Sequence, residues 1–181
     1  MTTTALPIVP RLRPRGETVA PERVLAERLS ARIRAVLQRS LHVRHLDAGS
    51  CNGCDWEIQA LMGPVYDLQR LGVDIVASPR HADLLLVTGS VTRNLEAAAR
   101  ATYDAMPEPR LVVAVGACAC GGGVLQGSYC TAGGVGNVLP VDVLIPGCPP
   151  RPQALLYGLM VAVERLQPRL MRTEIEVAAG A

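Results

Sequence analysis

The sequence contains no lysine, so all 18 of its basic residues are arginines. This absence excludes a P-loop in the glycine-rich stretches, because that motif needs a lysine that contacts the phosphates. The stretches GGGVLQG and GGVGNV also do not match the GxGxxG pattern of dinucleotide-binding turns. The sequence therefore gives no support for nucleotide binding, and we expect neither a nucleotide nor a nucleic acid among its ligands.

Long apolar runs are also absent. No run reaches the roughly 18 residues that a membrane-spanning helix needs. The N-terminus MTTTALPIVPRLRPRG has neither the apolar core of a secretory signal nor a twin-arginine pair. We therefore expect a cytoplasmic chain, and its 181 residues are enough for one domain of ordinary size. In a reducing compartment, six cysteines indicate metal ligation or catalysis rather than disulfides.

Positive charge is concentrated near the N-terminus. Residues 1–45 contain nine arginines and three glutamates, a net charge of +6, which leaves −4 on the other 136 residues within a total of +2. Residues 1–20 are rich in proline, arginine and threonine, and we expect an extended arm there. Residues 21–40 are predicted to form a basic amphipathic helix, because apolar residues recur at helical spacing: Val24, Leu25, Leu29, Ile33, Val36 and Leu37.

The apolar stripe of this helix must pack on the body of the protein or on a partner. Its arginines suggest docking to a partner subunit or to an anionic membrane surface. A solvated, arginine-rich helix face is the alternative.

From residue 41 onward, short apolar runs alternate with helical patterns. Strands are expected in LHVRHLDAG and at 73–78, 82–90, 110–117 and 138–147, the last edge-like because of its prolines. Helices are expected in EIQALMGPVYDLQRLG, interrupted or bent near Pro64, and in RNLEAAARATYDAM and RPQALLYGLMVAVERLQ. This alternation predicts an α/β sandwich around a small, mostly parallel sheet. We expect the domain to span residues 41–167, with a C-terminal tail at 168–181.

Four cysteines follow predicted strands. Cys51 and Cys54 lie in the predicted loop after the first strand, Cys118 ends VVAVGAC, and Cys148 ends VDVLIPGC. Functional groups of parallel sheets gather beyond the carboxyl ends of the strands, so one edge could receive all four thiols. A [4Fe–4S] cluster needs four thiolates, one for each iron, which need not be close in sequence. Glycines around these cysteines would allow a tight turn and a close backbone approach to the sulfides.

Other interpretations of the cysteines stay open at this point. A structural zinc site more often uses two CxxC knuckles, and a thioredoxin-like dithiol would leave all but Cys51 and Cys54 unexplained. Buried, inert thiols are the preferred interpretation of Cys120 and Cys130. Six cysteines cannot ligate two four-cysteine clusters, so one cluster is the limit unless other residue types serve as ligands.

A glutamate and three histidines are further candidates for functional or structural roles. Glu57, three residues beyond Cys54, is a candidate proton relay, because reduction of a cluster favours proton uptake nearby. A glutamate on a helix surface is the alternative interpretation. For His42 and His45 we expect surface or packing roles, and for His81 a capping or outer hydrogen-bonding role.

These motifs together resemble a known family. GSCNGCDWEIQAL, YDLQRLGV, SPRHADLLLVTGSVT, VAVGACACGGG and LPVDVLIPGCPPRPQALLYG closely resemble the small subunit of group 4, energy-converting [NiFe] hydrogenases, nearest to the formate hydrogenlyase type. The same superfamily contains the 20 kDa subunit of respiratory complex I. The resemblance covers about residues 41–160.

The resemblance implies a flavodoxin-like, three-layer sandwich that holds one [4Fe–4S] cluster beside a large subunit. By motif, the ligands are Cys51, Cys54, Cys118 and Cys148. Arg80 of SPRHAD matches an arginine near the cluster of complex I, where a positive charge could raise the cluster's potential. Glu57 matches the glutamate that follows the cysteine pair.

Two departures from the superfamily bear on function. Complex I subunits have adjacent cysteines where this chain has Asn52 and Gly53 between them, and an acidic-then-polar pair where it has Asn137 and Val138. Periplasmic uptake hydrogenases have further clusters, for which this chain has no spare ligands.

The leading hypothesis is therefore an electron-transfer subunit of a membrane-associated hydrogenase, a subunit of an oxidoreductase with no bond-making chemistry of its own. It would lie peripherally on the cytoplasmic face of the inner membrane. Its partners would be a [NiFe] large subunit, a ferredoxin-like subunit with further clusters, and a membrane-arm subunit contacted by residues 21–40. The alternatives are a complex I-like subunit whose cluster reduces quinone, and a zinc-stabilised scaffold without a redox role.

Overall fold

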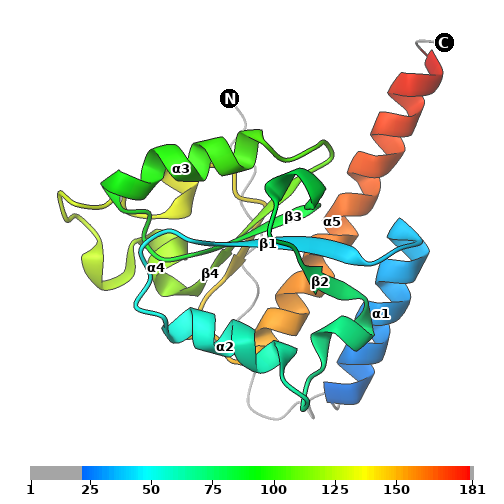
Figure 1. Ribbon diagram of the computed structural model, residues 1–181, viewed down its shortest axis with the longest axis horizontal. Coiled ribbons are helices and arrows are strands. Elements are labelled where there is room, and N and C mark those ends of the chain that lie inside the picture. The colour runs from blue at the N-terminus through cyan, green and yellow to red at the C-terminus, as the bar shows by residue number, and fades with distance from the viewer. Residues whose placement is uncertain (1–21, 180–181) are drawn as a thin grey trace, which may run out of the picture.

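The computed structural model describes the backbone of residues 22–179 and the side chains of residues 24–166. Five strands form one sheet in the order β2-β1-β3-β4-β5, and every neighbouring pair is parallel (Figure 1). The strands are β1 (Leu41–Asp47), β2 (Val73–Ile75), β3 (Leu84–Thr88), β4 (Leu111–Val115) and β5 (Val143–Ile145). This order is that of flavodoxin-like folds, so the predicted fold class is confirmed.

Five α-helices connect or flank the strands within the described part of the chain. They are α1 (Glu22–Leu37), α2 (Gly53–Met62), α3 (Arg93–Asp104), α4 (Gly116–Gly121) and α5 (Pro152–Ala179). Four short 3-10 helices lie in the connections: η1 (Leu68–Leu71), η2 (Pro79–His81), η3 (Gly123–Leu125) and η4 (Val135–Asn137).

The sheet separates two hydrophobic cores, which makes the fold a three-layer sandwich. Side chains alternate along β3, so Leu84 and Leu86 face one core while Leu85 and Val87 face the other. Helices α1, α2 and α5 contribute to the first core, and α3 and α4 contribute to the second. All five residues of β3 are buried, as are those of β4, which explains why these strands are continuous apolar runs.

The apolar stripe of α1 packs on the body of the protein. Leu29 and Ile33 are fully buried in the first core, where α1 lies against α5, while Arg28 and Arg34 are exposed. A helix within residues 21–40 is thus confirmed, and its stripe is not free for a partner. The predicted extended arm at residues 1–20 lies outside the described residues.

Two local features differ from expectation. The helix predicted from residue 57 begins earlier, at Gly53, so Cys54 lies in the first helical turn rather than in a loop. It ends at Met62, in agreement with the interruption expected near Pro64, because the residue before Pro64 takes an extended conformation, as residues before proline prefer. Helix α5 continues to Ala179, beyond residue 167, where we expected the domain to end.

Within the described part of the chain, no helix is both long enough and apolar enough to cross a membrane. The C-terminal half of α5 extends past the sheet in Figure 1.

The contact between α5 and β5 makes a prediction about stability. A Cβ atom added at Gly158 would lie 2.2 Å from Ile145 Cδ1. Overpacking of this kind costs about 1–3 kcal/mol, against a gain of about 1 kcal/mol from the better helix propensity of alanine. We therefore expect Gly158→Ala to lower the free energy of unfolding by about 1–2 kcal/mol in urea denaturation.

Gly136→Ala is the matched control, since a Cβ at Gly136 would meet open space. Its free energy of unfolding should stay within about 0.5 kcal/mol of the parent. Equal stability of the two variants would contradict the proposed packing of α5.

Candidate functional site

Four cysteines lie at the carboxyl edge of the sheet. Cys51 is in the loop after β1, Cys54 is in the first turn of α2, Cys118 is in α4 directly after β4, and Cys148 follows β5. Cys51 and Cys148 are exposed, while Cys54 and Cys118 are partly buried. The four cysteines therefore lie after the ends of three strands, as predicted.

Backbone contacts connect the three cysteine segments. The N–H of Ala117, beside Cys118, donates a 2.7 Å hydrogen bond to the carbonyl of Gly147, beside Cys148. The Cβ position of Gly53, between Cys51 and Cys54, lies 3.9 Å from Pro149. The loops after β1, β4 and β5 therefore contact one another at this edge.

The surroundings of Cys54 raise the pKa of its thiol. Burial is the main cause that raises this pKa, to about 12, and the charge of Asp55 adds to it. Negative charge on Cys51, Cys118 and Cys148 raises it further. Each of the other three thiols is thus within electrostatic range of Cys54, and in the metal-free chain Cys54 stays protonated at neutral pH.

Two glycines make room for the sulfur atoms. A Cβ at Gly116 would lie 2.5 Å from Cys54 Sγ, and a Cβ at Gly123 would lie 2.8 Å from Cys118 Sγ. Both glycines have positive φ, +90° and +54°, which other residues rarely adopt. Any side chain at these positions would collide with a thiol, so the backbone conformation and the space at this edge both require glycine.

The donor set fits an iron–sulfur cubane. Within the described residues, no three His, Cys, Asp or Glu side chains converge closely enough to hold a single metal ion. A cubane differs from a single ion because each thiolate binds its own iron atom, so the four sulfurs need not converge on one point. Four thiols within electrostatic range, on glycine-lined backbone, have the chemistry that such a cluster needs.

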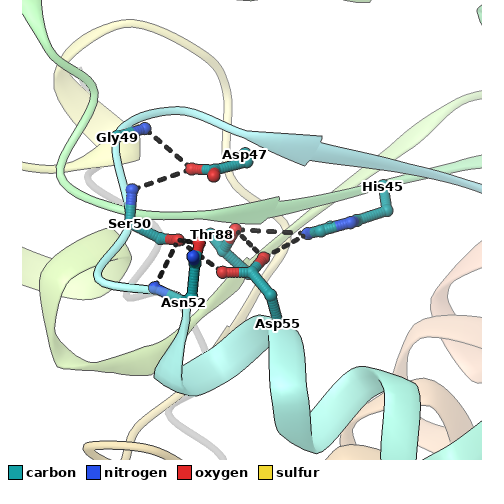
Figure 2. A network of polar contacts seen from close by, with 7 residues as sticks. All are labelled: His45, Asp47, Gly49, Ser50, Asn52, Asp55 and Thr88. Carbon is teal, nitrogen blue, oxygen red and sulfur yellow. Dashed lines mark hydrogen bonds and ion pairs between the residues drawn. The ribbon is translucent and has the colours of Figure 1, made fainter.

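A polar network lies beside Cys54 and centres on Asp55 (Figure 2). Asp55 Oδ1 accepts a 2.8 Å hydrogen bond from Thr88 Oγ1 and lies 2.9 Å from His45 Nε2. Asp55 Oδ2 accepts a short hydrogen bond from Ser50 Oγ. The carboxylate thereby joins α2 to β1, to β3 and to the loop that carries Cys51.

No chemical role is predicted from the sequence for His45, Asp55 or Thr88. The sequence does indicate that Thr88 has a polar partner, because a hydroxyl at the end of the buried run LLLVT needs a hydrogen bond. The identity of that partner could not be inferred, because Asp55 is 33 residues away in the sequence.

The structure does not bring the other predicted residues into this network. Glu57 is partly buried on α2, and its carboxylate has no hydrogen-bond or ion-pair partner among the described residues. Arg80 is exposed in η2. This segment lies near the start of β1, where His42 Nδ1 is 3.1 Å from the carbonyl oxygen of His81. Roles for Glu57 and Arg80 beside a cluster stay predictions.

The two remaining cysteines have different surroundings. Cys120 lies 3.8 Å from the Ala114 carbonyl, and burial raises its pKa to about 11, as expected of an inert thiol. Cys130 is exposed and lies 3.0 Å from Ser128 Oγ, so its predicted burial is wrong.

The sequence matches the model of a known protein family. The model described as the 20 kDa subunit of NADH ubiquinone oxidoreductase matches residues 51–162, which include all four cysteines.

Two curated relatives and one solved structure extend this finding. The probable membrane-bound hydrogenase subunit mbhJ of Pyrococcus furiosus is 44% identical over 159 residues, covering 88% of this chain and 95% of the relative. Formate hydrogenlyase subunit 7 of Escherichia coli is 44% identical over 134 residues, covering 74% of this chain and 52% of the relative. A chain of the archaeal membrane-bound sulfane sulfur reductase superposes with a TM-score of 0.64 at 35% identity, covering 78% of this chain and 77% of that chain.

The environment of Cys54 predicts low reactivity in the metal-free chain. At pH 8, iodoacetamide should alkylate Cys54 about tenfold or more slowly than Cys51, because the raised pKa leaves little thiolate and the side chain is partly buried. Peptide mass spectrometry with isotopically labelled reagent measures both rates in one sample.

Chain unfolded in urea is the control for this measurement, and there the two rates should converge. If Cys54 reacted as fast as Cys51 in the folded chain, the described surroundings of Cys54 would be wrong.

Proposed function

This chain belongs to the family of the 20 kDa subunit of NADH ubiquinone oxidoreductase, and from that premise we propose that it is an electron-transfer subunit with one [4Fe–4S] cluster. The complex it would serve is a membrane-associated group 4 [NiFe] hydrogenase. The relatives named as a membrane-bound hydrogenase subunit and a formate hydrogenlyase subunit support this choice.

The observation that carries the proposal is the gathering of four thiols at the carboxyl edge. Cys51, Cys54, Cys118 and Cys148 would hold the cluster, and Gly116 and Gly123 leave space for two of these sulfurs. When bound, such a cluster supplies one-electron transfer between a ferredoxin-like subunit and a Ni–Fe site in a large subunit. The reaction supported there is 2H⁺ + 2e⁻ ⇌ H₂, and this chain would make no bond itself.

Exposed apolar side chains near the cysteines support docking of the large subunit at this edge. Trp56 is 68% exposed on α2, two residues from Cys54. Val124 and Tyr129, in the segment after α4, are 92% and 94% exposed. Exposed aromatic and aliphatic residues of this kind are typical of protein–protein contacts. A large subunit that covers them would also shield Cys51 and Cys148 from water.

The other proposed contacts concern α1 and the membrane. Residues 21–40 would contact a membrane-arm subunit through the exposed arginines of α1. This contact would hold the chain peripherally on the cytoplasmic face of the inner membrane. Since six cysteines cannot ligate a second cubane beside the first, a separate ferredoxin-like subunit would supply the electrons. Glu57 would relay protons and Arg80 would tune the potential, as the family resemblance suggests.

Reduction of quinone is the second candidate function. The observation that favours it is the family model itself, which is described as a subunit of NADH ubiquinone oxidoreductase. The partner decides between the two functions: a large subunit with two CxxC pairs indicates a Ni–Fe site, whereas a large subunit without them indicates quinone or other chemistry. The residues between Cys51 and Cys54 favour the hydrogenase.

Substitution of the proposed ligands tests the cluster. Cys51→Ala and Cys148→Ala should each remove most of the cubane EPR signal and lower the iron and acid-labile sulfide per chain, because each would leave one iron without its thiolate. Cys130→Ala is the matched control, since it removes an exposed thiol outside the site and should leave iron and sulfide unchanged. Full iron content in Cys148→Ala would exclude this ligand set.

Zinc at one per chain, with iron and sulfide absent from the parent, would exclude the electron-transfer function.

Substitution of Trp56 tests the docking surface. Trp56→Ala should weaken the complex with the large subunit by about tenfold or more, because tryptophans central to an interface often carry much of its energy. Val65→Ala is the control, since Val65 is 79% exposed but follows the far end of α2. Both variants should keep the cluster signal, and equal affinities of the two for the large subunit would place the interface elsewhere.

A further inference from the structure

The Asp55 carboxylate is the most highly connected polar group near the cysteines. Thr88 Oγ1 donates to one of its oxygens at 2.8 Å, and Ser50 Oγ donates to the other. His45 Nε2 lies 2.9 Å from the oxygen that Thr88 contacts (Figure 2). Acceptance of hydrogen bonds by both oxygens is the pattern of an ionised carboxylate.

These contacts close the loop that carries two of the thiols. Ser50 directly precedes Cys51, and Asp55 directly follows Cys54, so the hydrogen bond between their side chains joins the two ends of the segment. Asn52 N–H donates to Ser50 Oγ at 3.0 Å inside the same loop. Thr88 is fully buried at the end of β3, so it anchors this closed loop to the sheet.

The same carboxylate places a negative charge beside the thiols. Asp55 directly follows Cys54 in the first turn of α2, so its carboxylate lies next to the residue that would ligate the cluster. A negative charge at this place repels any further negative charge on atoms bound to the neighbouring sulfur. The side chain of Asp55 is only 17% exposed, so water screens this charge incompletely.

We propose that Asp55 is a positioning residue that closes the Cys51–Cys54 loop against the sheet and, through its charge, lowers the reduction potential of a cluster bound there. This inference rests on the proposed function, since it concerns the cluster that the four cysteines would hold. One-electron reduction, with the electron supplied by the ferredoxin-like subunit, adds one negative charge at the site. The Asp55 carboxylate repels that charge and makes the midpoint potential more negative.

A redox titration followed by EPR tests the charge. The full chain is reconstituted with ferrous iron and sulfide, and the midpoint potential of the reconstituted parent is compared with that of Asp55→Asn. Asparagine keeps the shape and removes the charge, so the midpoint potential should shift to a more positive value. Asp104→Asn is the matched control, because it removes an exposed carboxylate at the C-terminal end of α3. The midpoint potential of this variant should equal that of the parent.

The outcomes separate the inference from the proposed function. A parent chain that takes up no iron and sulfide overturns the proposed function and the inference with it. A parent with a cubane signal and an Asp55→Asn variant of unchanged potential overturns the inference alone.

A second pair of variants decides the matter if Asp55→Asn retains no cluster. Thr88→Val removes one hydrogen bond to Asp55 and keeps the carboxylate, while Thr88→Ser restores the hydroxyl. Iron per chain after gel filtration should fall in Thr88→Val and return in Thr88→Ser. Equal iron retention in these two variants would overturn the positioning role.

Discussion

The in-register parallel pairing of the strands is the constraint on which the rest of the structure depends. Asp47 of β1 pairs with Thr88 of β3, Thr88 with Val115 of β4, and Val115 with Ile145 of β5. Four strands therefore end at one level, and the segments that follow them emerge together at the carboxyl edge. Hydrophobic cores on both faces of the sheet hold this register, because a shift by one residue would turn every buried side chain to the opposite core.

The close approach of the loops at the carboxyl edge constrains the backbone conformation and the ionisation of the thiols. Glycines at positive φ let the chain turn within a few ångströms of the sulfur atoms. Burial and the neighbouring carboxylate both oppose ionisation of Cys54 in the metal-free chain. A bound, positively charged metal centre would reverse that balance, because it stabilises thiolates. The charge of Asp55 thus opposes a free thiolate but is compatible with a metal-bound one, and partner subunits that exclude water would strengthen these charge effects.

Much of the fold and the placement of the four cysteines followed from local pattern. Apolar runs predicted the strands, and their alternation with helical patterns predicted the fold class, although strands β2, β3, β4 and β5 are shorter than the predicted runs. The cysteines were assigned to one edge because all four come shortly after the ends of predicted strands. Two local predictions were wrong: Cys54 lies in the first turn of α2, and Cys130 is exposed rather than buried. The polar network was missed because its members are spread over β1, α2 and β3, and no local pattern links residues from different elements.

The sequence by itself determined the fold class, the four thiols and the family, because strand periodicity, residue type and motif spacing are all local properties of the chain. Only the tertiary structure decided which groups surround those thiols. It brought the Thr88 hydroxyl and the His45 ring to the Asp55 carboxylate, and it packed the α1 stripe against α5. The physical reason is that hydrogen bonds and electrostatic interactions act between atoms that are close in space, and the sheet register sets which distant residues become close.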